Sequence, residues 1–141
     1  MIEVDFTKTV ECIWNHKKIN EIVLHIAKRV ARLKGCVEIN IVGEQAMKKI
    51  NRCYRGLDKP TDVLAFAWQE DVFIKTENLG QIYVCYPQIK RQAKHFQTTV
   101  KEEFVRILVH GLLHLVGYDH QSEMQAGKMF ALQENIVKEI K

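Results

Sequence analysis

The chain is organised around residues 100–120, whose sequence is VKEEFVRILVHGLLHLVGYDH. Up to Val116 this stretch has apolar residues on almost every side of a helix, so we expect a buried central helix over residues 100–116. Thr98 and Thr99 precede it and offer a cap for its amino end. A helix that is apolar on nearly all sides has to be covered by other elements, and the rest of the fold is therefore predicted to pack around it.

Three of the six histidines of the chain lie in the last eleven residues of this stretch, in the pattern H-x-x-x-H-x-x-G-x-x-H. His110 and His114 are four residues apart on a helix, so both imidazoles can reach one metal ion. Gly117 can take the left-handed conformation that ends a helix, and the turn would bring His120 round as a third ligand. A lone histidine on an apolar helix is usually a hydrogen-bonded core residue, but this spacing is that of the metzincin metal motif.

We therefore predict that His110, His114 and His120 bind one zinc ion per chain. Three nitrogen donors around a tetrahedral ion leave the fourth position open for water, as in catalytic rather than structural zinc sites. Copper, nickel and iron also accept imidazole ligands, so the donor set alone leaves the identity of the metal open.

The residue after the first histidine limits which reactions the predicted metal site can catalyse. Zinc peptidases have a glutamate there, which serves as the general base for attack by water. This chain has Gly111 instead. A zinc ion lowers the pKa of its bound water to about 7, so hydroxide is available at neutral pH without that glutamate. A peptidase or amidase that uses another base remains a second possibility.

Composition limits the class of protein. A length of 141 residues suits one domain over residues 1–141, and no apolar run approaches the length needed to span a membrane. The amino end lacks the layout of a signal peptide, and the four cysteines are widely spaced without a C-x-x-C pair. We expect a cytoplasmic protein with reduced thiols. The net charge of +4 permits a nucleic-acid partner without demonstrating one.

Hydrophobic periodicity predicts the remaining elements. We expect strands over residues 2–6, 36–42, 61–66 and 81–86, and helices over residues 8–34, 44–55 and 100–116, with further helices beginning near Pro87 and at the capping box of residues 122–125. The acidic residues at positions 70, 71 and 77, together with residues 78–80, indicate a loop or hairpin. This order predicts an α+β fold: a small mixed four-stranded sheet packed with helices around the central metal-binding helix, as in zincins.

Two motifs match those of a known family. The signature H-G-x-L-H-L-x-G-Y-D-H is met at every defined position by residues 110–120, and N-x-x-Y-R followed by T-D-V-L-S-F is met by Asn51, Tyr54, Arg55, residues 61–64 and Phe66. With these motifs the chain resembles the YbeY family of bacterial endoribonucleases. It departs from the family pattern in having Ala65 for serine, Ala67 for proline and Gln81 for aspartate.

The resemblance implies a zinc-dependent, single-strand-specific endoribonuclease. Its substrate would be ribosomal RNA, notably the 3′ end of the small-subunit RNA, and its partners the small ribosomal subunit and its assembly factors. The family's metal ligands carry over onto His110, His114 and His120, and its functional arginine onto Arg55. We expect Arg55 and His114 to be the catalytic residues.

Each further candidate has an ordinary structural explanation beside the functional one. Arg55 has a planar fork that can hold two phosphate oxygens, but it would also complement a helix dipole at a carboxyl end. Asp119 can orient a ligand or cap the turn after Gly117, and we favour the cap. Glu103 is expected in surface pairings with Arg106. A ribosome-assembly factor with a structural metal is the third functional alternative.

Overall fold

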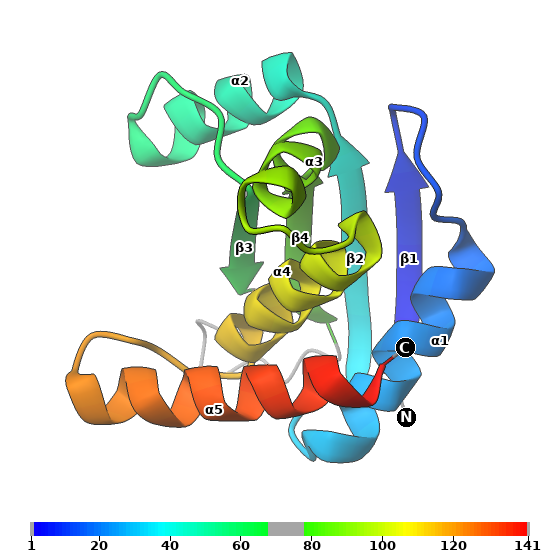
Figure 1. The fold of residues 1–141 in the computed structure, drawn as a ribbon, viewed down its shortest axis with the longest axis vertical. Helices are drawn as coiled ribbons and strands as arrows, with labels where there is room; N and C mark the ends of the chain where they lie inside the picture. The colour runs from blue at the N-terminus through cyan, green and yellow to red at the C-terminus, as the bar shows by residue number, and fades with distance from the viewer. Residues whose placement is uncertain (1, 68–77, 141) are drawn as a thin grey trace.

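The computed structural model describes residues 2–67 and 78–140. The elements of these ranges follow one another in the predicted order, strand and helix alternating first and three helices last (Figure 1). Their bounds are β1 (Ile2–Lys8), α1 (His16–Arg29), β2 (Gly35–Val42), α2 (Glu44–Arg55), β3 (Val63–Ala67), β4 (Asn78–Cys85), α3 (Tyr86–His95), α4 (Val100–Leu115) and α5 (Glu123–Glu139).

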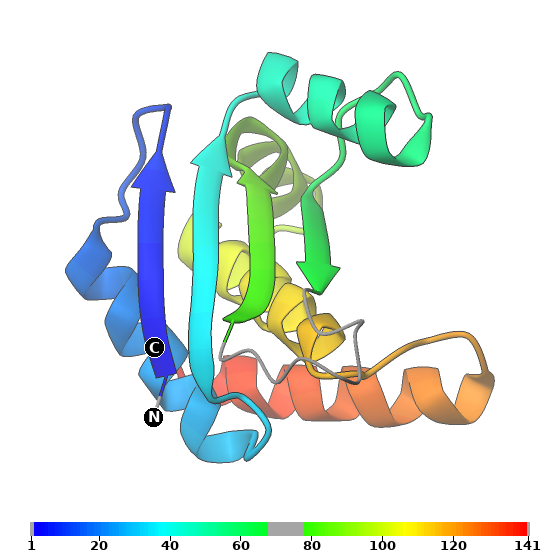
Figure 2. The same cartoon turned by 180° about the vertical axis from the view of Figure 1, so that it is seen from behind.

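The four strands form one mixed sheet in the order β1-β2-β4-β3. Strands β1, β2 and β4 are parallel, and β3 pairs antiparallel with β4 from Val63 opposite Val84 to Ala67 opposite Gly80. Helices α1, α3, α4 and α5 lie on one side of this sheet, while α2 lies across one end of it (Figures 1 and 2). The predicted α+β fold with a small mixed sheet is confirmed.

Helix α4 is the central element. Thr99 caps it by accepting a hydrogen bond from the backbone N–H of Glu102, and most of its side chains are buried. It packs on β3 and β4 on one side and on α3 and α5 on the others. Gly117 follows its end with a φ of 101°, and the N–H groups of Gly117 and Tyr118 bond to the carbonyls of His114 and Leu113. The predicted turn after the central helix is therefore present.

The first helix is shorter than its apolar periodicity predicts. It begins at His16, because the side chain of Asn15 accepts a hydrogen bond from the N–H of Lys18, and it ends at Arg29. Val30 and Leu33 are buried, but they lie in the connection to β2. Since Gly35 lies opposite Ile2 in the sheet, the chain must leave the helix early enough to reach the start of β2.

Strand β4 begins at Asn78, three residues before the predicted start, so residues 78–80 are strand and not turn. Gly80 has a φ of 150°, and a Cβ atom there would lie 2.1 Å from the backbone oxygen of Phe66. The glycine is thus explained by the close approach of β3 rather than by a turn. The acidic residues predicted for a loop, at positions 70, 71 and 77, lie outside the described residues.

No helix in the described part of the chain combines the length and the apolar character needed to cross a bilayer.

Candidate metal centre

Three imidazoles converge where α4 ends. His110 and His114 project from the last two turns of the helix, and His120 comes from the segment that follows Gly117. One ring nitrogen from each histidine lies within 4.8 Å of the others. The structure therefore brings together all three of the predicted ligands, in a set that can hold a metal ion.

The geometry of the helical pair fits such an ion closely. The Nε2 atoms of His110 and His114 face one another at 3.2 Å. Zinc–nitrogen bonds of about 2.0–2.1 Å at a tetrahedral angle place two ligand nitrogens roughly 3.3 Å apart. The two rings thus already have the separation that one tetrahedral ion between them requires.

The surroundings of His114 favour its neutral imidazole, which is the form that binds metals. Burial lowers the pKa of His114, and the neighbouring rings of His110 and His120 lower it further. A proton on His114 is therefore disfavoured at neutral pH, and little has to be displaced when a metal binds.

Helix α5 completes the site with two residues that sequence reasoning missed. The side chain of Gln133 is buried, and its Oε1 lies 2.8 Å from Nδ1 of His110. The ring of Phe130 is nearly parallel to those of His110 and His120, at 6.0 and 6.3 Å between centroids. One signal was present in the sequence: Gln133 is a polar residue four positions after Met129, on the apolar face of its helix.

Gly111 lies against the sheet. A Cβ atom at this position would be 3.3 Å from Cγ2 of Val63 and 3.4 Å from Cδ1 of Ile82. The side chain of a glutamate would therefore start between the apolar side chains of β3 and β4. Position 111 is therefore poorly suited to the peptidase glutamate, and a peptidase of this kind would need its base from another residue.

The histidines open into a cleft of about 690 Å³ that also includes Arg55. Strand β3 provides one wall of it, α4 and α5 provide most of the rest, and Thr61, Asp62 and His120 also line it. Arg55 is the last residue of α2, is exposed, and makes no side-chain hydrogen bond or ion pair with any described residue. The predicted arginine and the predicted metal ligands thus share one cleft.

Comparison with known proteins identifies the family. The family model described as Endoribonuclease YbeY matches residues 4–141. The chain belongs to this family. The Endoribonuclease YbeY of Sulfurihydrogenibium sp. is 42% identical over 101 residues, which cover 71% of this chain and 66% of that protein. The Endoribonuclease YbeY of Mycoplasmopsis synoviae is 36% identical over 135 residues, covering 93% and 87% of the two chains.

A solved structure agrees with this assignment. The solution structure of TM1509 from Thermotoga maritima superposes with a TM-score of 0.67 at 31% identity, covering 99% of this chain and 88% of that one. The protein is thus a member of an endoribonuclease family, enzymes that hydrolyse RNA phosphodiester bonds within the strand.

None of the three departures from the YbeY pattern replaces one of the three histidines. Ala65 and Ala67 are in β3 and line the cleft, where they leave more room than larger side chains would. Gln81 does not line that cleft; it lies in β4 and accepts a hydrogen bond from the hydroxyl of Tyr83. The missing YbeY aspartate at position 81 therefore removes no carboxylate from the histidine cleft.

Two carboxylates beside the YbeY signature have structural partners. Asp119 accepts a hydrogen bond from the N–H of His120 at 2.7 Å, in agreement with the turn-capping role that we favour. Glu103 pairs with Arg106 as predicted, but it is 3% exposed and also accepts a hydrogen bond from Gln92. The expectation of a surface pairing was wrong, because α3 covers this side of α4.

The basic residues near Arg55 mostly lie outside the cleft. Lys48 and Arg52 lie near Asp58, at 4.0 and 3.8 Å, and Arg91 pairs with Glu44. Of the four basic residues Lys48, Arg52, Arg55 and Arg91, Arg55 alone lines the cleft.

Proposed function

We propose that this protein is a zinc-dependent endoribonuclease specific for single-stranded RNA. Its substrate would be ribosomal RNA, notably the 3′ end of the small-subunit RNA, and it would support ribosome assembly in the cytoplasm. The observation that carries the proposal is the separation of 3.2 Å between Nε2 of His110 and Nε2 of His114, with His120 beside them in the same cleft as Arg55.

The residues of the chain would divide the chemistry between them. His110, His114 and His120 would hold the zinc ion, which would supply an acidified water and polarise a phosphoryl oxygen. Arg55 would hold the non-bridging oxygens of the RNA phosphate, since its guanidinium is planar, charged and free of partners among the described residues. Water and the ribose 2′-hydroxyl are both candidate nucleophiles for this site.

The shape of the site supports a single strand. The cleft lies along the edge strand β3, and the three histidines line its wall. The scissile phosphate must therefore enter the cleft to reach the metal ion that they would hold. A flexible strand can turn one phosphate inward, whereas the stacked bases of a duplex restrain its backbone. The small-subunit RNA and the assembly factors are proposed as partners from the family alone.

Cleavage of a structured RNA with a single-stranded 3′ tail tests the proposal. We would compare wild type, wild type after metal removal, the same sample after zinc is restored, and His114→Ala. His95→Ala is a matched control, because His95 is an exposed histidine at the end of α3 that does not line the cleft. We expect cleavage in the tail that disappears with the metal, returns with zinc, and falls at least ~100-fold in His114→Ala.

The other outcomes separate the alternatives. Equal cleavage by wild type and His114→Ala would indicate a contaminating nuclease and contradict the proposal. A folded, zinc-loaded wild type that binds the RNA without cutting it would favour an assembly factor with a structural metal.

A further inference from the structure

The two ring nitrogens of His110 have separate partners. Nε2 faces the ring of His114, and Nδ1 lies 2.8 Å from Oε1 of Gln133. Gln133 comes from α5 and is 5% exposed, so this contact is shielded from water. A buried amide beside a metal-binding imidazole can fix which ring nitrogen carries the proton.

The direction of this hydrogen bond follows from the neighbour of Gln133. The Nε2 group of Gln133 lies 3.2 Å from a carboxylate oxygen of Glu134. A carboxylate only accepts hydrogen bonds, so Gln133 must present its NH₂ group to Glu134 and its carbonyl oxygen to His110. His110 must then donate through Nδ1–H, which leaves the lone pair on Nε2 directed at the ligand cluster.

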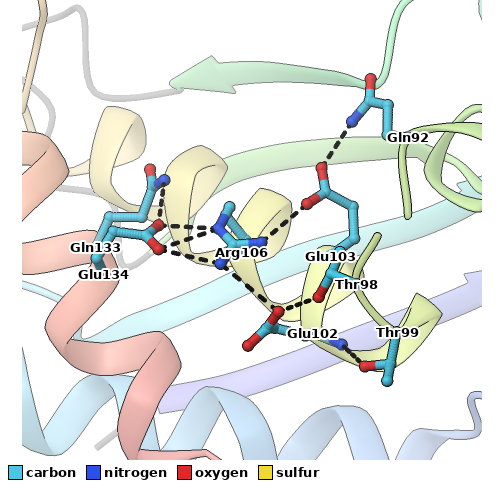
Figure 3. A network of polar contacts seen from close by, with 8 residues as sticks. All are labelled: Gln92, Thr98, Thr99, Glu102, Glu103, Arg106, Gln133 and Glu134. Carbon is cyan, nitrogen blue, oxygen red and sulfur yellow. Dashed lines mark hydrogen bonds and ion pairs between the residues drawn. The ribbon is translucent and has the colours of Figure 1, made fainter. Parts of the chain in front are cut away.

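Glu134 is held in this role by Arg106. The guanidinium binds the carboxylate through Nε at 2.9 Å and Nη2 at 3.0 Å, a two-pronged arrangement that fixes the plane of the carboxylate (Figure 3). Arg106 lowers the pKa of Glu134, so the group stays ionised and remains an acceptor at neutral pH.

Arg106 itself is anchored on its other side. Its Nη1 donates to Glu103 at 3.0 Å, and the second oxygen of this buried carboxylate accepts from Gln92 of α3 at 2.9 Å (Figure 3). The contacts therefore run from α3 through α4 to α5 and return to α4 at His110, one helical turn after Arg106.

We propose that Gln133 is a positioning residue, which sets the tautomer and the ring orientation of His110 so that Nε2 is available to a divalent cation. The inference rests on the metal site of the proposed function. It goes beyond the three ligands by assigning a role to an amide on another helix, with Glu134 and Arg106 fixing how that amide is turned.

Substitutions at position 133 distinguish the contribution of the hydrogen bond to zinc binding from that of side-chain packing. Gln133→Met keeps the length of the side chain and removes the acceptor, while Gln133→Glu keeps an acceptor for Nδ1–H. Gln125→Met is the matched control, since Gln125 is an exposed glutamine in the first turn of the same helix. The zinc dissociation constant is measured by competition with a chelator, and the free energy of unfolding of the metal-free protein checks that each variant folds.

We expect Gln133→Met to bind zinc about 10–100-fold more weakly than wild type. Gln133→Glu should recover most of that loss, and Gln125→Met should bind as wild type does. Long-range ¹H–¹⁵N NMR on the metal-free proteins, well above the usual imidazole pKa of about 6.5, reports the tautomer directly. We expect the Nδ1–H form of His110 in wild type and a shift towards Nε2–H in Gln133→Met.

A second variant covers the case in which Gln133→Met does not fold. Glu134→Met leaves the partner of His110 in place and removes the group that fixes the amide, so a smaller, few-fold loss of zinc affinity is expected. Unchanged zinc affinity together with an unchanged tautomer in Gln133→Met would overturn the role of Gln133 while leaving the proposed nuclease intact. A wild type that binds no zinc would overturn both.

Discussion

Arg55 contributes little to the fold at the level of the single residue, since its exposed side chain has no partner among the described residues. Replacing it should therefore leave stability almost unchanged, apart from the few tenths of a kcal/mol that a cation contributes near a helix carboxyl end. Arg55→Ala should lower kcat/KM for RNA cleavage by roughly 100-fold, because the phosphate loses its charged partner. Arg55→Lys should recover only part of this activity, since an ammonium cannot hold two oxygens in one plane.

Arg52→Ala is the control for this prediction. Arg52 lies one turn earlier on α2, is exposed, and does not line the cleft. Its removal should leave cleavage within about twofold of wild type. Steady-state kinetics on one RNA substrate measures all three variants, and equal activity of Arg55→Ala and Arg52→Ala would exclude a role for Arg55 at the phosphate.

Replacing Gly111 by glutamate, the residue that zinc peptidases have there, tests whether the packing at this position tolerates that side chain. Gly111→Ala adds only a Cβ atom, in contact with Val63 at 3.3 Å, and a small adjustment can accommodate it. Gly111→Glu adds a carboxylate next to apolar side chains, which should cost at least about 2 kcal/mol more than the alanine does. Urea unfolding of the metal-free variants measures the difference. Equal stability of the two variants would contradict this prediction. It would mean that the glutamate side chain avoids the apolar neighbours and reaches the cleft.

The sequence was sufficient to predict that the three histidines converge, because they are local. His110, His114, Gly117 and His120 occupy eleven residues, and helix periodicity together with one glycine turn predicts that they converge. Gln133 could not be placed in the same way, because its contact with His110 depends on how α5 crosses α4, which is a property of tertiary packing.

At the scale of elements, the spacing between β3 and β4 depends on Gly80. In Gly80→Ala the new Cβ atom would lie 2.1 Å from the backbone oxygen of Phe66 and 2.9 Å from Cδ2 of Leu115, so the strands and the end of α4 would have to move apart. We expect a loss of about 2–4 kcal/mol in the free energy of unfolding. Zinc affinity should fall as well, since Leu115 is adjacent to His114.

Gly127→Ala is the matched control for Gly80→Ala. Nothing lies within 4 Å of a Cβ atom at position 127, which is inside α5. The same chemical change should there stabilise the protein by roughly 0.5–1 kcal/mol, because alanine is the better helix former. Thermal and urea unfolding measure the change in stability, which should be a loss for Gly80→Ala and a gain for Gly127→Ala. A stable Gly80→Ala variant would mean that the β3–β4 pairing tolerates a wider spacing.

The ion pair between α4 and α5 predicts a pH dependence of stability. Arg106 lowers the pKa of Glu134 from its usual value of 4.5, so the folded state binds this proton less readily than the unfolded state does. The stabilisation from the pair is therefore fully present above pH 4.5 and is lost as the pH falls through the lower folded-state pKa. The side chain of Glu134 is 41% exposed, and solvent screening makes the effect modest.

Urea unfolding of the metal-free protein between about pH 6 and pH 3 measures this effect. The difference in stability between wild type and Glu134→Gln should be constant at the upper end and shrink in acid. Glu21→Gln, at an exposed position of α1, should show no such convergence. A difference that grew as the pH fell would contradict the assigned direction of the pKa shift.

The ends of elements were harder to predict than their order. Asparagine and glycine at positions 78 and 80 usually indicate a turn, but here they begin a strand because another backbone approaches Gly80 closely. The apolar period of α1 continues through Val30 and Leu33, yet both pack in a connection. In each case a tertiary contact determined the local structure, and no local pattern contains that information.

At the scale of the whole molecule, the sequence predicted a mixed sheet but not the order of its strands. Strand β4 lies between β2 and β3, so the chain adds the edge strand β3 before it fills the position beside β2. Turn chemistry and periodicity are the same for either arrangement. The order matters for function because it places β3 at the sheet edge, where it forms a wall of the cleft between Arg55 and the histidines.

The placement of all three ligands within residues 110–120 has a consequence for folding. A short segment closes a small loop at little entropic expense, so the denatured chain can still gather these imidazoles around an ion. Ligands that also bind the denatured ensemble raise the melting temperature less than their native affinity would suggest. We therefore expect the proposed zinc ion to contribute more to catalysis than to the stability of the fold. A chelator should abolish RNA cleavage under conditions in which the protein remains folded.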